Sequence, residues 1–254
     1  MKLSKVLTFC LLLLSFQSVV SQTKATQISF PVPTIEQEAT SIWRTINDIK
    51  FFEKQGYRVH LPKVPQIDSL IAKSKRGAFG NDDYPQIYNL VERHVFDEQD
   101  YAKAIEKVKS QEVLINNLID TLRNTQSQWN WKFKTFGRYQ VVFTLYGTGG
   151  SYDPDRGIIT LFTNSQGKFM NYESPANTII HEIVHMGIEK EIVQKLRLSH
   201  GLKERVVDTI VYLLFKEKLS EYRIQNMGNP KLDDLLKAKS DIASLPKILK
   251  KLAE

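Results

Sequence analysis

The stretch Pro175-Ala-Asn-Thr-Ile-Ile-His-Glu-Ile-Val-His-Met-Gly-Ile188 decides the prediction of the fold. Ser174 can cap a helix here, and a proline suits the first helical position. Residues four positions apart in a helix lie on one face, about 6 Å apart along the axis. The imidazoles of His181 and His185 can therefore converge on one metal ion, while Glu182 lies on an adjacent face and can reach water beside that ion.

A His-Glu-x-x-His match can arise by accident, at a rate on the order of one in a hundred chains of this composition. The setting of this match argues against accident. Apolar residues surround it, and two histidines and a glutamate are costly to bury unless a partner compensates their polar atoms. We predict that His181 and His185 hold Zn²⁺ and that Glu182 acts as the general base.

A catalytic zinc usually has three protein ligands and one open position, so a third ligand must come from another segment. After Ser199-His200-Gly201, a second helix is expected over residues 202–215. Glu204 lies in its first turn, and Asp208 lies one turn further on the same face. The 18 residues between His185 and Glu204 are enough for the first helix to end and the second to return antiparallel.

The spacing His181-Glu182-x-x-His185 followed by Glu204-x-x-x-Asp208 resembles the gluzincin, or thermolysin-like, zinc metallopeptidases. The resemblance covers residues 181–208. It implies that Glu204 is the third zinc ligand and that Asp208 holds a histidine ligand through its other ring nitrogen. It also implies a zincin-like α+β fold, with a small mixed β-sheet next to the active-site helix.

The same resemblance implies an edge strand that lines the cleft and pairs with an extended peptide substrate. Two segments of this sequence are candidates for that strand, Gly149–Asp153 and Gly157–Phe162. An ordinary hairpin over the same residues is the alternative, because Asp153-Pro-Asp-Arg-Gly157 is a strong turn signal.

Other residues near the motif could in principle serve as ligands. Glu189 continues the line from the two histidines but is too far along the axis, and His200 lies in the connecting segment. A metzincin site does not fit, because it would need a histidine where Glu191 stands. A deformylase-like site does not fit either, because it would need a cysteine ligand and the mature chain has no cysteine.

The residue that stabilises the oxyanion is harder to identify, because no histidine follows Glu204 in the chain. Tyr222 is the candidate, since its phenol and the Arg223 guanidinium could both donate to a carbonyl oxygen. The alternatives are that Tyr222 caps a surface helix or that His200 is the donor.

Residues 1–21 are typical of a secretory signal peptide, because Lys2 and Lys5 precede an apolar run. We expect cleavage near Ser21 and an exported protein, periplasmic or extracellular. A membrane anchor is the alternative, although the run is shorter than the about 20 residues that span a bilayer. Cleavage would remove the only cysteine, Cys10, and with it any disulfide or thiolate ligand.

The formal net charge is +7, and loss of the two lysines in residues 1–21, which hold no acidic residue, would leave +5. This excess is spread along the chain, so we expect no nucleic-acid partner. No second hydrophobic span follows, and we therefore expect no stable membrane span after signal cleavage.

The mature chain divides at a soft boundary near residue 128. Residues 22–128 are expected to be mostly helical, with an extended start and a first helix near 35–52 that Thr34 can cap and Gly56 ends. Further helices are expected near 66–74, 84–95 and 98–126, and a short strand at 57–61. Residues 129–254 form the zincin-like region, with strands within 129–147 and at 158–162 ahead of the two motif helices.

These features predict a zinc-dependent peptidase that hydrolyses peptide bonds of a peptide or protein substrate. In this hypothesis zinc activates a water, and Glu182 takes its proton and delivers it to the leaving amine. The alternative is a catalytically inactive, zinc-stabilised protein that binds peptides or the cell envelope, and a weaker one is an exported toxin-like effector.

Overall fold

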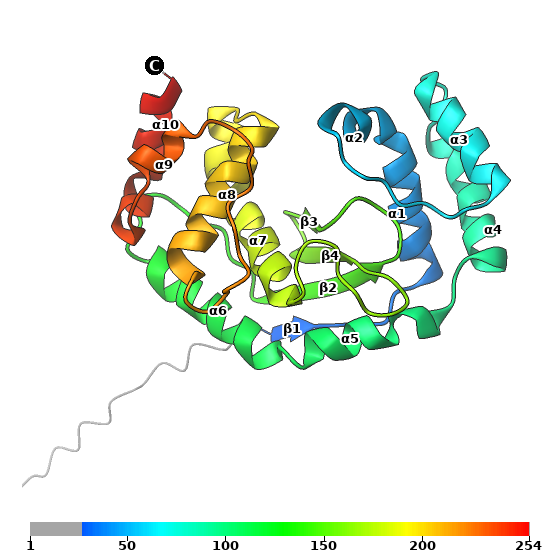
Figure 1. The fold of residues 1–254 in the computed structure, drawn as a ribbon, viewed down its shortest axis with the longest axis horizontal. Helices are drawn as coiled ribbons and strands as arrows, with labels where there is room; N and C mark the ends of the chain where they lie inside the picture. The colour runs from blue at the N-terminus through cyan, green and yellow to red at the C-terminus, as the bar shows by residue number, and fades with distance from the viewer. Residues whose placement is uncertain (1–26, 254) are drawn as a thin grey trace, which may run out of the picture.

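The computed structural model describes residues 27–253, and its fold is α+β, as expected (Figure 1). The signal peptide expected at residues 1–21 lies outside the described residues. The helices are α1 (Ile35–Asn47), α2 (Ile49–Gln55), α3 (Pro65–Lys75), α4 (Tyr84–His94), α5 (Ala102–Lys109), α6 (Glu112–Gln126), α7 (Pro175–Ile188), α8 (His200–Phe215), α9 (Lys231–Leu235) and α10 (Leu245–Ala253). A π-helical segment, Glu189–Gln194, extends α7, and 3-10 turns span Asn81–Asp83, Glu98–Tyr101 and Lys239–Ser244.

The strands form one small mixed sheet in the order β1-β2-β4-β3. They are β1 (Gln27–Ser29), β2 (Arg138–Thr144), β3 (Ser151–Asp153) and β4 (Ile158–Phe162). The first three in the sheet order run parallel, and β3 pairs antiparallel with β4 at the edge. Of the two segments considered for an edge strand, Gly149–Asp153 therefore contains one, whereas Gly157–Phe162 contains a strand paired on both sides.

The turn between β3 and β4 follows its sequence signal. The Asp153 carboxylate accepts hydrogen bonds from the backbone N–H groups of Asp155 and Arg156, at 3.0 and 3.1 Å. Gly157 has φ +69°, a left-handed conformation that glycine adopts without steric cost. The hairpin is thus specified locally, and it sets β3 at the edge of the sheet.

The first helices pack on one another and form a small apolar core at one end of the molecule. Thr34 begins α1 with a capping box to Gln37, and Gly56 ends α2 at φ +73°, both as the sequence predicts. The single helix expected between them is interrupted at Asp48, whose backbone leaves the helical range at ψ 12°. The core residues are Ala39, Ile42, Ile46, Ile67, Leu70, Ile87, Leu90 and Val91.

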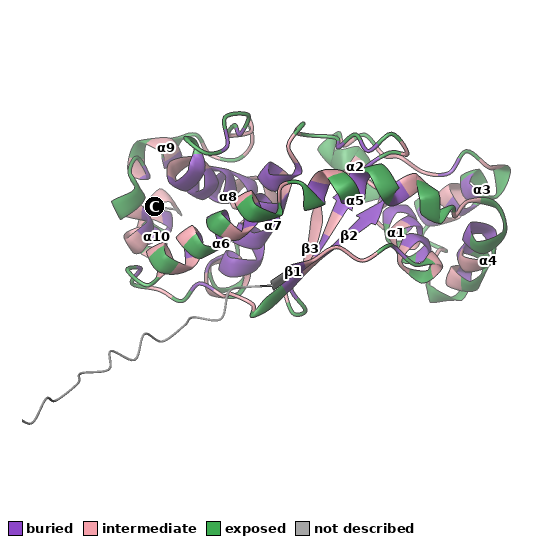
Figure 2. Cartoon of the chain, turned by 90° about the horizontal axis from the view of Figure 1, so that it is seen from below, coloured by how far each residue is buried: buried purple, intermediate pink, exposed green. Residues whose placement is uncertain are grey.

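The larger core lies between the sheet and the helices α5 to α8. Helix α7 is buried along almost its whole length, which Figure 2 shows in purple. It contacts β3 and β4 on one side and α6 and α8 on others. Side chains from α5 and α6 belong to this core, together with residues from the C-terminal helices. The expected domain boundary near residue 128 stays a prediction.

Three local expectations were wrong. Residues 57–61 form no strand, only a bridge between His60 and Gly147. The segment 98–126 is not one helix, because the chain breaks at Ser110 and Gln111. Of residues 129–147, only Arg138–Thr144 is a strand, because Phe133 packs against Gly187 of α7 and Trp131 donates to the Ile242 carbonyl instead of forming a ladder.

Among residues 27–253, none of the helices combines the length and the apolar character that crossing a bilayer requires.

Candidate metal centre

Helix α7 is positioned from its first turn. Pro175 stands at its first position, as expected, but the Ser174 hydroxyl donates to the Gln111 side chain instead of capping the helix, at 2.8 Å. The same Gln111 oxygen accepts from the backbone N–H of Ala176 at 3.1 Å. A side chain from the break between α5 and α6 therefore caps the helix that carries the motif.

The far end of α7 is fixed by a close approach to the aromatic segment before β2. A Cβ built on Gly187 would lie only 1.9 Å from the Phe133 ring, so only glycine fits there. The backbone N–H of Lys134 donates to the Gly187 carbonyl at 3.0 Å. These contacts determine the depth at which the helix lies.

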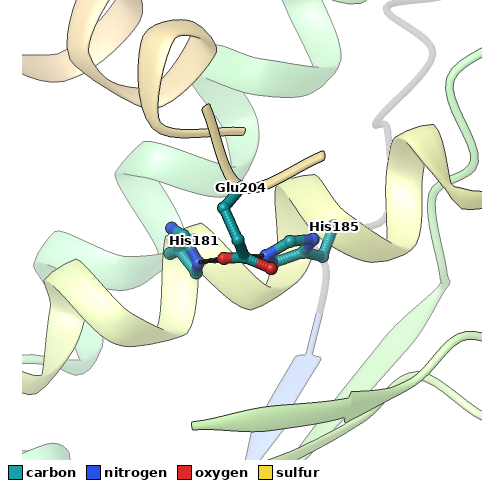
Figure 3. A group of neighbouring side chains, drawn as sticks. All are labelled: His181, His185 and Glu204. Atoms are coloured by element: carbon teal, nitrogen blue, oxygen red, sulfur yellow. Dashed lines mark hydrogen bonds and ion pairs between the residues drawn. The ribbon is translucent and has the colours of Figure 1, made fainter. Parts of the chain in front are cut away.

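His181 and His185 project from α7 toward Glu204, which lies one turn into α8 (Figure 3). The two Nε2 atoms are 3.0 Å apart, and the Glu204 Oε2 atom lies 3.4 Å from His181 Nε2 and 3.2 Å from His185 Nε2. All three side chains are buried or nearly so. The structure therefore brings together the three residues that the sequence predicts as metal ligands.

This arrangement fits a metal ion. Two imidazole lone pairs and a carboxylate oxygen repel one another at such distances unless a cation or a proton lies between them. Ligand atoms at about 2.0–2.2 Å from a tetrahedral zinc are about 3.3–3.6 Å apart, close to the separations observed. Two histidine nitrogens and a carboxylate oxygen are also the donor set of many catalytic zinc sites.

The ring of His181 is held from behind by Tyr222 and Asp208. The Tyr222 hydroxyl donates to Asp208 Oδ1 at 2.8 Å and lies 2.7 Å from His181 Nδ1. Since the hydroxyl proton is given to Asp208, the Nδ1–H of His181 donates to the Tyr222 oxygen. This directs the Nε2 lone pair toward Glu204 and His185, as metal ligation requires.

Asp208 is fully buried and lies 3.2 Å from His181 Nδ1, consistent with the role implied for it by the resemblance. Its Oδ2 atom accepts from the backbone N–H of Gln225 at 2.8 Å. The expected oxyanion role of Tyr222 does not fit this geometry. Its hydroxyl is buried behind the histidine and engaged on both sides, so Tyr222 orients His181 and is not free to contact a substrate carbonyl.

The ring of His185 is held differently. Tyr152 of β3 stacks on it, with the ring centroids 5.0 Å apart and an interplanar angle of 11°. The Tyr152 hydroxyl donates to Glu189 at 2.7 Å, which gives Glu189 a hydrogen-bonded role and not a ligand role. The Nδ1 atom of His185 is buried without a hydrogen-bond partner in the described residues. Nothing in the sequence pattern indicated Tyr152.

Glu182 is buried beside the triad under the edge of the sheet. Burial raises the pKa of Glu182 to about 7, with His181 opposing and Glu204 adding to the shift. A Cβ at Gly150 would lie 2.4 Å from Glu182 Oε1, so the carboxylate occupies the space that a side chain would fill. A carboxylate with a pKa near neutrality is suited to accept and return a proton.

The pKa shifts within the triad favour a proton on His181, with His185 neutral and Glu204 ionised. Burial lowers the pKa of His185 to about 4. Burial acts in the same direction on His181, but hydrogen bonds to Asp208 and Glu204 outweigh it and raise the pKa of His181 to about 10. Burial alone would raise the pKa of Glu204, but the two histidines hold it well below its usual range. A metal cation would compete with this proton for the same lone pairs.

The site opens into a cleft of about 540 Å³. Residues 148–152, which belong to the edge strand β3 and the loop before it, form one wall, and Phe51, Phe52 and Tyr57 from the N-terminal helical part form another. His200 also lines the cleft, and its Nε2 atom lies 2.6 Å from the Tyr57 hydroxyl. Its Nδ1 atom is 3.7 Å from Glu204 Oε1, but among the described residues only His181, His185 and Glu204 bring their ligand atoms within 4.8 Å of one another, so His200 is not part of the ligand group.

Comparison of the chain with protein-family models, with curated proteins and with solved structures found no match.

Proposed function

We propose that this protein is a zinc-dependent peptidase of the gluzincin type that acts on peptide or protein substrates outside the cytoplasm. The observation that carries the proposal is the convergence of His181 Nε2, His185 Nε2 and Glu204 Oε2 within 3.0–3.4 Å beside the Glu182 carboxylate. Zinc as the metal, the zincin-like fold and export through residues 1–21 are parts of this proposal.

The position of the edge strand supports a peptide substrate. Strand β3 and the residues before it line the cleft directly above α7. An extended peptide laid along this edge would gain main-chain hydrogen bonds, with its own side chains directed alternately to the two sides.

The chain's own residues account for the proton transfers. Zinc at this site would supply Lewis acidity, which acidifies a water and polarises a carbonyl. Glu182 takes the proton of the attacking water, because its carboxylate lines the cleft beside the three ligands. It then gives that proton to the leaving amine. Tyr222 and Asp208 keep His181 in the tautomer that presents Nε2.

The test combines metal analysis with cleavage of an unbiased peptide library, read by mass spectrometry. We expect one zinc per chain and defined cleavage products. Glu182→Gln should keep the zinc and lose cleavage, whereas Glu191→Gln, a change at a half-buried carboxylate that pairs with Lys195 beyond the end of α7, should change neither. Cleavage retained by Glu182→Gln would exclude Glu182 as the base.

One observation favours the second candidate, a zinc-stabilised binding protein without catalysis. Tyr222, expected to stabilise the oxyanion, is engaged behind His181. A binding protein would hold zinc and retain library peptides without cleaving them, and Glu182→Gln would leave that binding unchanged. The library experiment separates the two candidates.

A further inference from the structure

Lys203 lines the cleft immediately before Glu204 on α8, and neither the metal site nor the base uses it. Its side chain is only 20% exposed. The ammonium nitrogen lies 3.7 Å from Glu204 Oε1 and 3.5 Å from the Tyr152 hydroxyl, with the Tyr152 ring centroid at 5.6 Å. The long side chain is thus held at the metal centre by an aromatic ring.

The hydrogen-bonding capacity of this ammonium is largely unused. Lysine carries three N–H donors, and the contacts to Tyr152 and Glu204 lie at or beyond the usual limit for a hydrogen bond. Tyr152 gives its own proton to Glu189, so toward Lys203 it acts only as an acceptor. Among residues 27–253 the Lys203 ammonium has no other acceptor, so at least one of its N–H groups is free at the lining of the cleft.

A cation at this place is costly for a metal site. The ammonium contacts one of the residues expected to hold a dication, and like charges at such a separation repel. A cation here is favourable when negative charge develops nearby, as it does on a carbonyl oxygen during attack by water. The other cations that line the cleft, Arg44 and Arg223, make no recorded contact with the triad, and Arg223 lies over Tyr172 at 5.4 Å.

We propose that Lys203 is the donor that stabilises the oxyanion, in the role that Tyr222 cannot fill. The inference rests on the proposed peptidase function. As the water oxygen bonds to the carbonyl carbon, the π pair of the carbonyl moves to its oxygen, which accepts a hydrogen bond from Lys203. Glu182 holds the water's proton. The pair then returns, the C–N bond breaks, and the amine leaves with that proton.

The competing role for Lys203 is to anchor the free carboxylate at the end of a substrate. Both roles use an ammonium and an anion, but they differ in when the anion is present. A terminal carboxylate is charged in the ground state, so removing the ammonium that anchors it raises KM. This effect on KM disappears when the peptide ends in an amide. An oxyanion exists only during reaction, so its donor acts on kcat with either peptide.

The chain offers a matched control for Lys203. Lys216, at the other end of α8, also places its ammonium over a tyrosine ring, at 5.5 Å from the Tyr212 centroid, but is exposed and does not line the cleft. Lys203→Met, Lys203→Arg and Lys216→Met would be compared after zinc loading, with zinc content and Tm measured first. If Lys203→Met loses zinc or stability, Lys203→Gln replaces it in the comparison.

The first measurement is steady-state kinetics on a cleaved library peptide, prepared with a free and with an amidated C-terminus. We expect Lys203→Met to lower kcat by about 10²–10³-fold on both peptides with little change in KM. Lys203→Arg should lose less, and Lys216→Met nothing. Unchanged kcat, or an effect confined to the free-carboxylate peptide, would overturn the proposal.

The second measurement needs no turnover. The protein is loaded with Co²⁺ in place of zinc and titrated with methylphosphonate, a small tetrahedral anion, while the visible spectrum is followed. We expect Lys203→Met to weaken methylphosphonate binding at least tenfold, with Lys216→Met like the wild type. Equal affinities would refute the role of Lys203, whether or not the wild type cleaves peptides. Absence of cleavage by the wild type would refute the peptidase function separately.

Discussion

Replacing Tyr222 by phenylalanine tests how this site prepares a histidine for metal binding. The change removes one oxygen, which joins His181 Nδ1 at 2.7 Å to Asp208 Oδ1 at 2.8 Å. The ring itself is buried and stacked on Tyr172, so phenylalanine keeps the packing. The perturbation therefore acts on the hydrogen bonds that orient His181 and hardly on the core.

The size of the loss in zinc affinity depends on which contacts to His181 remain in Tyr222→Phe. Partners behind a metal-ligating histidine contribute about 10–100-fold to metal affinity. Asp208 Oδ1 still lies 3.2 Å from His181 Nδ1, so it can take over part of the role of the hydroxyl. We expect the loss at the lower limit, about tenfold in the Kd for zinc, or about 1.4 kcal/mol. Asp208→Ala, which removes the final acceptor, should reach about 100-fold.

The assay is competition for zinc between the protein and a chromophoric chelator at constant pH. Tyr172→Phe is the matched control, because its ring stacks on Tyr222 while its hydroxyl contacts only the Arg223 carbonyl, at 3.5 Å. An unchanged Kd in Tyr222→Phe, or an equal loss in the control, would refute the orienting role.

Three further changes have defined outcomes. Gly150→Ala should displace the Glu182 carboxylate and abolish cleavage with zinc retained, whereas alanine one residue earlier, where the nearest atom is 3.6 Å away, should have little effect on either measurement. Gly187→Ala should lower the free energy of unfolding by at least about 1–3 kcal/mol, measured in urea, because its Cβ overlaps the Phe133 ring; unchanged stability would contradict this close packing. Burial raises the pKa of Glu38 above its usual value against three opposing hydrogen bonds, so the folded state binds more protons than the unfolded state, and stability falls as pH rises through the folded pKa. The Tm of Glu38→Gln should therefore fall less with rising pH than that of the wild type, and parallel curves would contradict the shift.

The parts of the structure that the sequence predicted well are specified by local signals. Thr34 and Gly56 mark helix ends through backbone geometry that depends on a few neighbouring residues. The hairpin around Gly157 depends on its own turn residues. The α7 and α8 helices, with their ligand spacing, follow from periodicity in the same way, and the meeting of the three predicted ligands follows from pairing those two helices.

The failures involve tertiary contacts. The helix expected over residues 98–126 breaks where the Gln111 side chain turns away to cap α7, more than 60 residues further along the chain. Residues 129–136 have the composition of strands, yet Phe133 packs against Gly187, a contact that no periodicity reveals. The interruption at Asp48 leaves α2 as a separate helix, which carries Phe51 to the cleft.

The site shows the same division between local and tertiary information. His181 and His185 could be named from their spacing, and Glu204 from the resemblance to the gluzincin metallopeptidases. Tyr222 was named, but with the wrong role, because the sequence does not say on which side of a histidine a distant tyrosine lies. Tyr152, which stacks on His185, could not be found, since only the antiparallel pairing of β3 brings it there.

The measurement that tests the central claim most directly is anomalous X-ray diffraction at the zinc edge, on crystals of the zinc-loaded protein. The account predicts one strong peak, about 2.0–2.2 Å from His181 Nε2, His185 Nε2 and a Glu204 carboxylate oxygen. Glu204→Ala should abolish or strongly weaken that peak. No peak between these residues, or a peak held elsewhere in the chain, would contradict the account.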